Sequence, residues 1–143
     1  MKTLIIAAGD GTRLSKYTKD IPKPLISLDG KPLIETILDK CKGLGLNDFV
    51  IVTGYLEEKI KTKIQKLINK SEINVEFISN PEFDKENGLS VYCARNALKN
   101  EDRFLLMMAD HIFDSALLKK IINYNIKEGC LLAIDKNLSK IFD

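Results

Sequence analysis

The sequence predicts an α/β protein in which helices cover a mostly parallel sheet. Short runs rich in Ile, Val, Leu and Phe alternate along the chain with segments whose apolar residues recur at helical spacing. Such alternation implies parallel strands joined by helices. The runs are apolar at successive positions, which is typical of strands buried on both faces.

The apolar runs define the expected strands. They cover residues 3–8, 49–53, 74–79, 103–109 and 130–135. None of them approaches the roughly 18 apolar residues that a membrane-spanning helix requires, so no membrane segment is expected in this chain.

Between these strands, apolar side chains line one face of each expected helix. The helices cover residues near 34–41, 60–68, 87–98 and 118–122. Pro32 suits the first turn of the first helix, where no backbone N–H donor is needed. Gly43 and Gly45 suit its end, and Ser115 is expected to cap the last helix.

Composition is that of a soluble globular protein. The chain has 143 residues, of which 45% are hydrophobic and 29% charged, with a formal net charge of +2. This length corresponds to about one domain, so we expect residues 1–143 to form one. The two signs of charge are mixed along the chain, which gives no indication of nucleic-acid binding. With no signal-type segment at the start, a cytoplasmic location is expected.

The cysteines do not form a recognisable metal or redox motif. Cys41, Cys93 and Cys130 are far apart, lie in apolar segments and lack CxxC spacing. We therefore expect buried thiols in a reducing compartment.

The first strand leads into a loop that reads AAGDGTRL from residue 7 and continues to IPKPL at residues 21–25. Alanine and glycine allow a base or phosphate to approach the backbone closely, and successive N–H groups in such a turn bind anions. Arg13 adds a planar fork for phosphate oxygens, and Lys23 a point charge between two prolines. The loop is therefore predicted to bind a polyphosphate. Its predicted nucleotide-binding residues are Ala7, Ala8, Gly9, Gly11, Thr12, Arg13 and Lys23.

Two other nucleotide motifs do not fit this loop. The dinucleotide fingerprint needs a third glycine where Leu14 stands, and an acidic residue at the end of the second strand, where the sequence has Thr53 and Gly54. The Walker A pattern GxxxxGK[ST] occurs nowhere in the sequence. Two glycines alone are also compatible with a simple surface loop, but the cations that follow them favour phosphate binding.

AAGDGTRL followed by IPKPL resembles the signature of the sugar-phosphate nucleotidyltransferase superfamily, and DFVIVTGYLEEKI resembles its second strand and following helix. The resemblance extends over essentially the whole chain. It implies a Rossmann-like, doubly wound, mostly parallel sheet, and transfer of a nucleoside monophosphate from an NTP with Mg²⁺. It also implies that Arg13 and Lys23 contact the nucleotide phosphates and the transition state.

The segment Asn87, Gly88, Leu89, Ser90 resembles the base-recognition segment of the same superfamily. Free backbone donors at a helix start and small polar side chains can bind a base edge or a ribose. Asn87, Gly88 and Ser90 are therefore expected to bind the nucleotide. Local chemistry alone also allows Asn87 to be a helix cap and Gly88 a turn residue.

Asp110 stands at the carboxyl end of the fourth expected strand, beside the same loop. Mg²⁺ prefers oxygen ligands and keeps several waters, so one carboxylate and the phosphate oxygens of an NTP suffice to hold it. Asp110 is the predicted metal ligand, and a catalytic residue together with Arg13 and Lys23, although a strand-end aspartate can also be a turn residue. His111, the single histidine, is expected to support the site rather than act as a general base.

The reaction needs no general base. A phosphomonoester has a second pKa of about 6, so the attacking oxygen is already ionised near neutral pH. In-line attack on the α-phosphorus expels pyrophosphate, while Arg13, Lys23 and Mg²⁺ stabilise the developing charge.

ENGLSVYCARNAL and RFLLMMADHIFD most resemble the inositol-1-phosphate cytidylyltransferase branch, which implies CTP as donor and inositol-1-phosphate as acceptor. Choline-phosphate cytidylyltransferases and hexose-1-phosphate nucleotidyltransferases share the first loop and remain alternatives. Asp135 and Lys136 are candidates for contact with the acceptor phosphate, or else an exposed ion pair.

Domains of the superfamily continue beyond the point that corresponds to Asp143, through strands that complete the acceptor pocket and supply a second metal-binding aspartate. The resemblance therefore implies a C-terminally truncated domain, consisting of the N-terminal, nucleotide-binding portion. A function of another class also stays open, namely a nucleotide-binding module without turnover.

Overall fold

The computed structural model describes residues 1–11 and 20–134. Thr12, Arg13, Asp135 and Lys136 lie outside the described residues, so the roles predicted for them stay predictions. The chain divides into two units, Met1–Ile112 and Phe113–Asp143, which are described separately.

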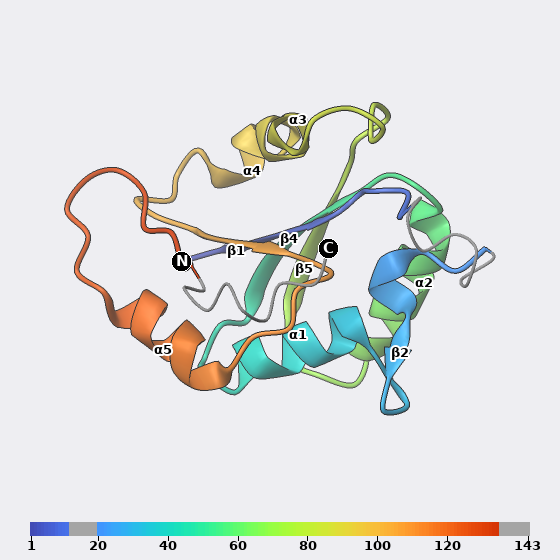
Figure 1. The fold of residues 1–143 in the computed structure, drawn as a ribbon, viewed down its shortest axis with the longest axis horizontal. Helices are drawn as coiled ribbons and strands as arrows, with labels where there is room; N and C mark the ends of the chain where they lie inside the picture. Colours follow the sequence, from blue (N-terminus) through green and yellow to red (C-terminus); the bar gives the residue numbers. More distant parts are fainter. Residues whose placement is uncertain (12–19, 135–143) are drawn as a thin grey trace. The chain divides into compact units, whose positions relative to one another are not determined.

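The first unit is built on a parallel four-stranded sheet (Figure 1). Its strands are β1 (Thr3–Ala7), β4 (Asp48–Thr53), β5 (Asn74–Ser79) and β6 (Leu105–Met108), in the order β5-β4-β1-β6. Ala7 pairs with Thr53, Thr53 with Ser79, and Ile6 with Met108. The carboxyl ends of all four strands therefore meet along one edge of the sheet.

Helices cover both faces of this sheet, which confirms the predicted doubly wound α/β fold (Figure 1). The helices of this unit are α1 (Leu33–Lys42), α2 (Glu57–Ile68), α3 (Asn87–Cys93) and α4 (Arg95–Leu98). Ala94 and Leu98 pack with Leu4, Val50 and Val52 on the α3 and α4 side. On the other side, α1 and α2 each bury one apolar face. The buried residues are Ile34, Ile37, Leu38 and Cys41 of α1 and Ile60 and Ile64 of α2.

The helix expected over residues 87–98 is divided at Ala94. Ala94 ends α3 with a ψ of −2°, and α4 begins at the next residue. The first helix ends at Lys42, as the glycines predict, and Gly45 adopts the left-handed φ of +78° in the turn that follows. Pro32 lies just before α1, at its N-cap position, rather than inside the first turn.

A short hairpin after the first loop was not expected from the sequence. It follows a turn of 3₁₀ helix (Lys23–Leu25) and pairs β2 (Ser27–Leu28) with β3 (Lys31–Pro32). Asp29 and Gly30 form its turn with φ values of 52° and 80°. An Asp-Gly pair with both φ positive is typical of the two-residue turns that join antiparallel strands.

Gly54 lies where the segments that follow three strands approach one another closely. A Cβ at this position would lie 2.5 Å from Cβ of Phe83 and 3.0 Å from the carbonyl oxygens of Ala8 and Asn80. Glycine is therefore required here to let the segments after β1, β4 and β5 approach one another.

The strand expected at residues 130–135 is wrong over its described part, because residues 130–134 are not in a strand. Leu132 and Ile134 are 76% and 68% exposed. A short apolar run forms a strand only where another strand satisfies its backbone groups, and none pairs with it in the described part of the chain.

The expectation of three buried thiols is also wrong. Cys41 is buried, Cys93 is half-buried and Cys130 is exposed. Burial raises the pKa of the Cys41 thiol to about 12, so this side chain behaves as an apolar core group. Cys130 is exposed because the run that contains it is not a buried strand.

The second unit contains α5 (Ser115–Asn123). Asp114, and not Ser115, caps it: Oδ1 of Asp114 accepts a hydrogen bond from the backbone N–H of Ala116 over 2.6 Å. Aspartate at this position also offers a full negative charge to the positive end of the helix dipole. Among the helices of residues 1–11 and 20–134, none is long and apolar enough to cross a membrane.

Candidate nucleotide-binding site

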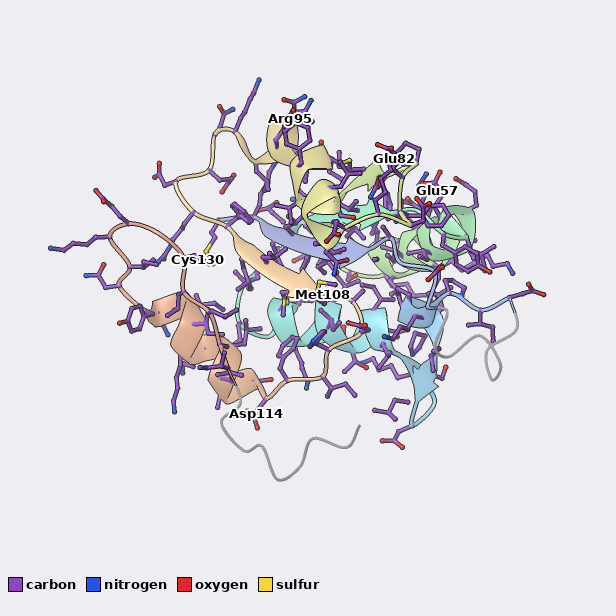
Figure 2. All side chains as sticks on the ribbon, turned by 45° about the horizontal axis from the view of Figure 1, so that its top comes forward. Glu57, Glu82, Arg95, Met108, Asp114 and Cys130 are labelled. Atoms are coloured by element: carbon purple, nitrogen blue, oxygen red, sulfur yellow. The ribbon has the colours of Figure 1, made fainter. Side chains whose placement is uncertain are left out.

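A cleft opens at the carboxyl edge of the sheet, within the first unit. Its walls come from the end of β1 and the glycine loop, from the 3₁₀ turn, from the start of α3 and from the end of β6. The residues that line it are Ile6, Ala7, Gly9, Asp10, Gly11, Lys23, Pro24, Asn87, Met108, Ala109 and Asp110. Met108, labelled in Figure 2, marks the β6 side of this cleft. Ligands of parallel sheets bind at this edge, because loops and helix starts converge there.

The structure brings the predicted phosphate-binding lysine and the predicted metal ligand together. Nζ of Lys23 lies 2.5 Å from Oδ2 of Asp110, although 87 residues separate the two in sequence. Their side chains are 29% and 24% exposed, so the pair is partly shielded from water. Pro24 is buried beside it and holds the short turn that presents the lysine.

Asp110 is kept as a carboxylate by its neighbours. Burial disfavours its charged form, but hydrogen bonds from Lys23 and His111 outweigh that effect and hold the pKa of Asp110 below its ordinary value. Nδ1 of His111 lies 2.7 Å from Oδ1 of Asp110, while the rest of the ring is largely exposed. Both carboxylate oxygens therefore have a partner from this chain.

The glycine loop passes close to Lys23. Gly11 has a φ of +65°, and a Cβ added to it would lie 3.4 Å from Cβ of Lys23. The left-handed conformation and the close approach both favour glycine at this position. Gly9 also lines the cleft, so at these two glycines the loop presents backbone rather than side chains to a ligand.

Among the predicted nucleotide-binding residues that the structure describes, three do not line the cleft. Ala8 is buried, and its carbonyl accepts a hydrogen bond from the backbone N–H of Tyr55 over 2.9 Å. Gly88 is exposed on α3. Ser90 is 3% exposed, and its Oγ accepts a hydrogen bond from the side chain of Asn80. Direct contact between these residues and a nucleotide stays a prediction.

Asn87 does line the cleft, and it is the first residue of α3 rather than its cap. Glu86 occupies the N-cap position and makes no capping hydrogen bond through its side chain. The position of Asn87 is thus compatible with ligand binding and gives no support to the capping alternative.

Sequence reasoning missed two residues of this region. Asp10 lines the cleft as a second carboxylate, and its position directly after Gly9 in the loop was the available signal. Asn80 is buried and hydrogen-bonds to Ser90 of α3, and only its place directly after a strand could have indicated it.

The donor chemistry of the cleft fits Mg²⁺. Carboxylate oxygens are the protein ligands that this ion prefers, and it commonly retains water and substrate oxygens. Within residues 1–11 and 20–134 no group of three or more His, Cys, Asp or Glu side chains is arranged to hold a metal by itself. A site that uses Asp110 therefore needs further oxygens, from water or from a phosphate ligand.

Comparison with known proteins gives relatives with the same fold. The bifunctional IPC transferase and DIPP synthase of Aquifex aeolicus is 32% identical over 93% of this chain and 29% of its own length. CTP:phosphoglutamine cytidylyltransferase of Campylobacter jejuni is 30% identical over 99% of this chain and 55% of its own length. The solved inositol-1-phosphate CTP transferase of T. maritima superposes with a TM-score of 0.71 at 24% identity, and the match covers 84% of this chain and 47% of that one.

The chain thus spans about half the length, or less, of these relatives. Residues 3–138 match the family described as the MobA-like NTP transferase domain, which is nearly the whole sequence. The chain belongs to the MobA-like NTP transferase family.

Proposed function

We propose that this chain is the nucleotide-binding part of a cytidylyltransferase. In the reaction CMP passes from CTP to a phosphorylated small molecule, inositol-1-phosphate, with release of pyrophosphate. The family supports nucleotide transfer, and a relative named as a CTP-dependent cytidylyltransferase supports the choice of CTP. The acceptor is proposed from the relative named as an IPC transferase and from the resemblance of residues 86–98.

One observation carries the proposal. Lys23 and Asp110 face each other inside the cleft at 2.5 Å, beside the backbone of Gly9 and Gly11. A cation for phosphate oxygens, a carboxylate for a metal and a loop of exposed backbone donors are the parts that binding of a metal-bound triphosphate requires.

Each of these residues has a proposed task. Asp110 would hold Mg²⁺ together with phosphate oxygens and water, and the bound ion would neutralise charge on the triphosphate and polarise the α-phosphate. When the nucleotide binds, Lys23 leaves its ion pair with Asp110, pairs with a phosphate oxygen and stabilises the charge that develops on the α-phosphate. Thr12 and Arg13 extend the loop and are proposed as further phosphate contacts.

Asn87 is proposed to bind the base or the ribose, with Gly88 and Ser90 shaping the segment around it. The attacking oxygen of the acceptor phosphate needs no base, because its second pKa is about 6. The rate of transfer then depends on the orientation of the acceptor and on stabilisation of the charge on the α-phosphate.

Two measurements test the proposal. Calorimetry with CTP, UTP, GTP and ATP in the presence of Mg²⁺ should show the lowest Kd for CTP. Tighter binding of another NTP would refute the cytidylyl assignment and keep nucleotide transfer, whereas no binding of any NTP would refute both.

The acceptor is tested by pyrophosphate release from CTP with inositol-1-phosphate, choline phosphate or a hexose-1-phosphate. The 143-residue chain is compared with the same chain extended along its natural reading frame. Release with inositol-1-phosphate above the other two supports the proposed acceptor. CTP binding without release by either chain would favour the nucleotide-binding module.

A further inference from the structure

Asn80 is a buried polar residue whose groups join three segments of the first unit. It is 1% exposed and follows β5 directly. Its backbone N–H donates to the carbonyl of Thr53, the last residue of β4, over 2.7 Å. Nδ2 donates to Oγ of Ser90, and Oδ1 accepts from the backbone N–H of Glu82, each over 3.0 Å. Breaking any of these bonds would leave a buried polar group unsatisfied.

The two bonds of the side chain require an asparagine. The backbone N–H of Glu82 can only donate, so it must face the amide oxygen of Asn80, and Nδ2 then faces Ser90. A leucine would satisfy neither neighbour, and an aspartate would bury a charge. Glu82, labelled in Figure 2, lies on the segment that leads from β5 to α3, so the amide holds both ends of this connection.

The Asn80 amide is linked to the cleft through α3. Ser90 is one helical turn beyond Asn87, and residues three apart lie on the same side of a helix. Asn87 lines the cleft, whereas Ser90 is buried against Asn80. No side chain of the described residues caps the start of α3, so its first turn gains its fixed position from contacts such as this one.

We propose that Asn80 is a positioning residue for base recognition. Its amide fixes Ser90 and thereby the turn of α3 that presents Asn87 to the cleft. It acts on the base and not on the triphosphate, because Lys23 and the glycine loop belong to other segments. The inference rests on the proposed function, in which the Asn87 segment reads the base.

The test uses the whole chain with Asn80→Ala, with Ser90→Ala and with both. Calorimetry gives the Kd of each NTP and of inorganic tripolyphosphate with Mg²⁺, after circular dichroism has established that each variant is folded. Loss of one hydrogen bond should raise the Kd of the preferred NTP about threefold to tenfold and reduce its preference over the others. The Kd of tripolyphosphate should stay unchanged, which a general loss of structure would not allow.

Ser90→Ala removes a single hydroxyl and is the milder change if Asn80→Ala does not fold. Because both substitutions break the same bond, the double variant should lose little more base preference than Asn80→Ala alone. The matched control is Asn74→Ala at the start of β5. The Asn74 amide donates to Oδ1 of Asp48 over 2.8 Å at the opposite edge of the sheet, so base preference should be kept.

Two results with the folded variants would overturn the inference: base preference that survives in Ser90→Ala, or equal weakening of NTP and tripolyphosphate binding. An unmodified chain that binds all four NTPs equally would overturn it and leave nucleotide binding standing. An unmodified chain that binds no NTP would refute the proposed function itself, and the inference with it.

Discussion

Replacing Lys23 by methionine should increase the affinity of the free protein for a divalent cation. The ammonium group of Lys23 lies 2.5 Å from Oδ2 of Asp110, on the carboxylate that is proposed to hold Mg²⁺. A metal ion that binds there without nucleotide must therefore displace the lysine. Nucleotide phosphates offer Lys23 another partner, so the metal and the triphosphate should bind more tightly together than apart.

The size of this effect follows from the geometry of the pair. Two unit charges about 4 Å apart attract each other by about 4 kcal/mol at an effective dielectric constant of about 20. Partial exposure of both side chains reduces this figure, and hydrogen bonds to charged groups contribute about 1.5–3 kcal/mol. Since about 1.4 kcal/mol corresponds to a factor of ten, Lys23→Met should tighten binding of free metal about tenfold to a hundredfold.

Titration with Mn²⁺, followed by electron paramagnetic resonance without nucleotide, measures this affinity directly. Asp110→Asn should abolish the gain, because it removes the ligand. Lys63→Met is the matched control: Nζ of Lys63 lies 3.2 Å from Oε2 of Glu35 in another partly exposed pair, so its loss should leave Mn²⁺ binding unchanged. Equal Mn²⁺ affinity of Lys23→Met and the unmodified chain would refute the reasoning.

Three further substitutions test the packing and charge of the first unit. Gly54→Ala should lower the free energy of unfolding by about 1–3 kcal/mol in urea denaturation, because its Cβ would meet Phe83 at 2.5 Å; Gly88→Ala, with open space around it, should not. Thr3→Val should raise the free energy of unfolding by about 1 kcal/mol, because the buried Thr3 hydroxyl has no hydrogen-bond partner among the described residues. An unchanged free energy of unfolding would indicate that the hydroxyl does have a partner. The pKa of Asp110 is lowered from 3.8, so its pair stabilises the fold above that pH and the effect is lost as pH falls through the folded value. Asp110→Asn should therefore flatten the pH dependence of stability below about pH 4, and an unaltered profile would exclude the pair as its source.

Local sequence pattern was sufficient for the parallel sheet and its helices. The run at residues 49–53 became the buried strand β4 because it consists of β-branched and apolar residues. The run at residues 74–79 became β5, in which Val75, Phe77 and Ile78 are half-buried and the polar residues are exposed. The run at residues 130–135 is also mostly apolar, but no strand pairs with it in the described part of the chain. A run's composition shows that it can form a strand, and only the tertiary structure decides whether a partner is present.

The candidate site was predictable to the extent that strand ends mark it. Lys23 and Asp110 were each identified from their local surroundings, and both line the cleft. Their mutual contact was not predictable, since it joins positions 87 residues apart. The buried position of Ser90 was not predictable either, because a small polar residue at a helix start has the same sequence signal whether it faces a ligand or the core.

The functional residues depend on the register of the strands in the sheet. Asp110 lies two residues beyond β6, Asn80 one beyond β5 and Gly9 two beyond β1. Ala7 pairs with Thr53, and Thr53 pairs with Ser79. A shift of one strand by one residue would therefore move the functional residue that follows it by about 3.3 Å relative to those that follow the other strands. Such a shift exceeds the roughly 1 Å misplacement that can reduce a reaction rate a hundredfold. The apolar core that fixes this register, together with the close approach that Gly54 permits, is therefore as necessary to the site as the charged residues are.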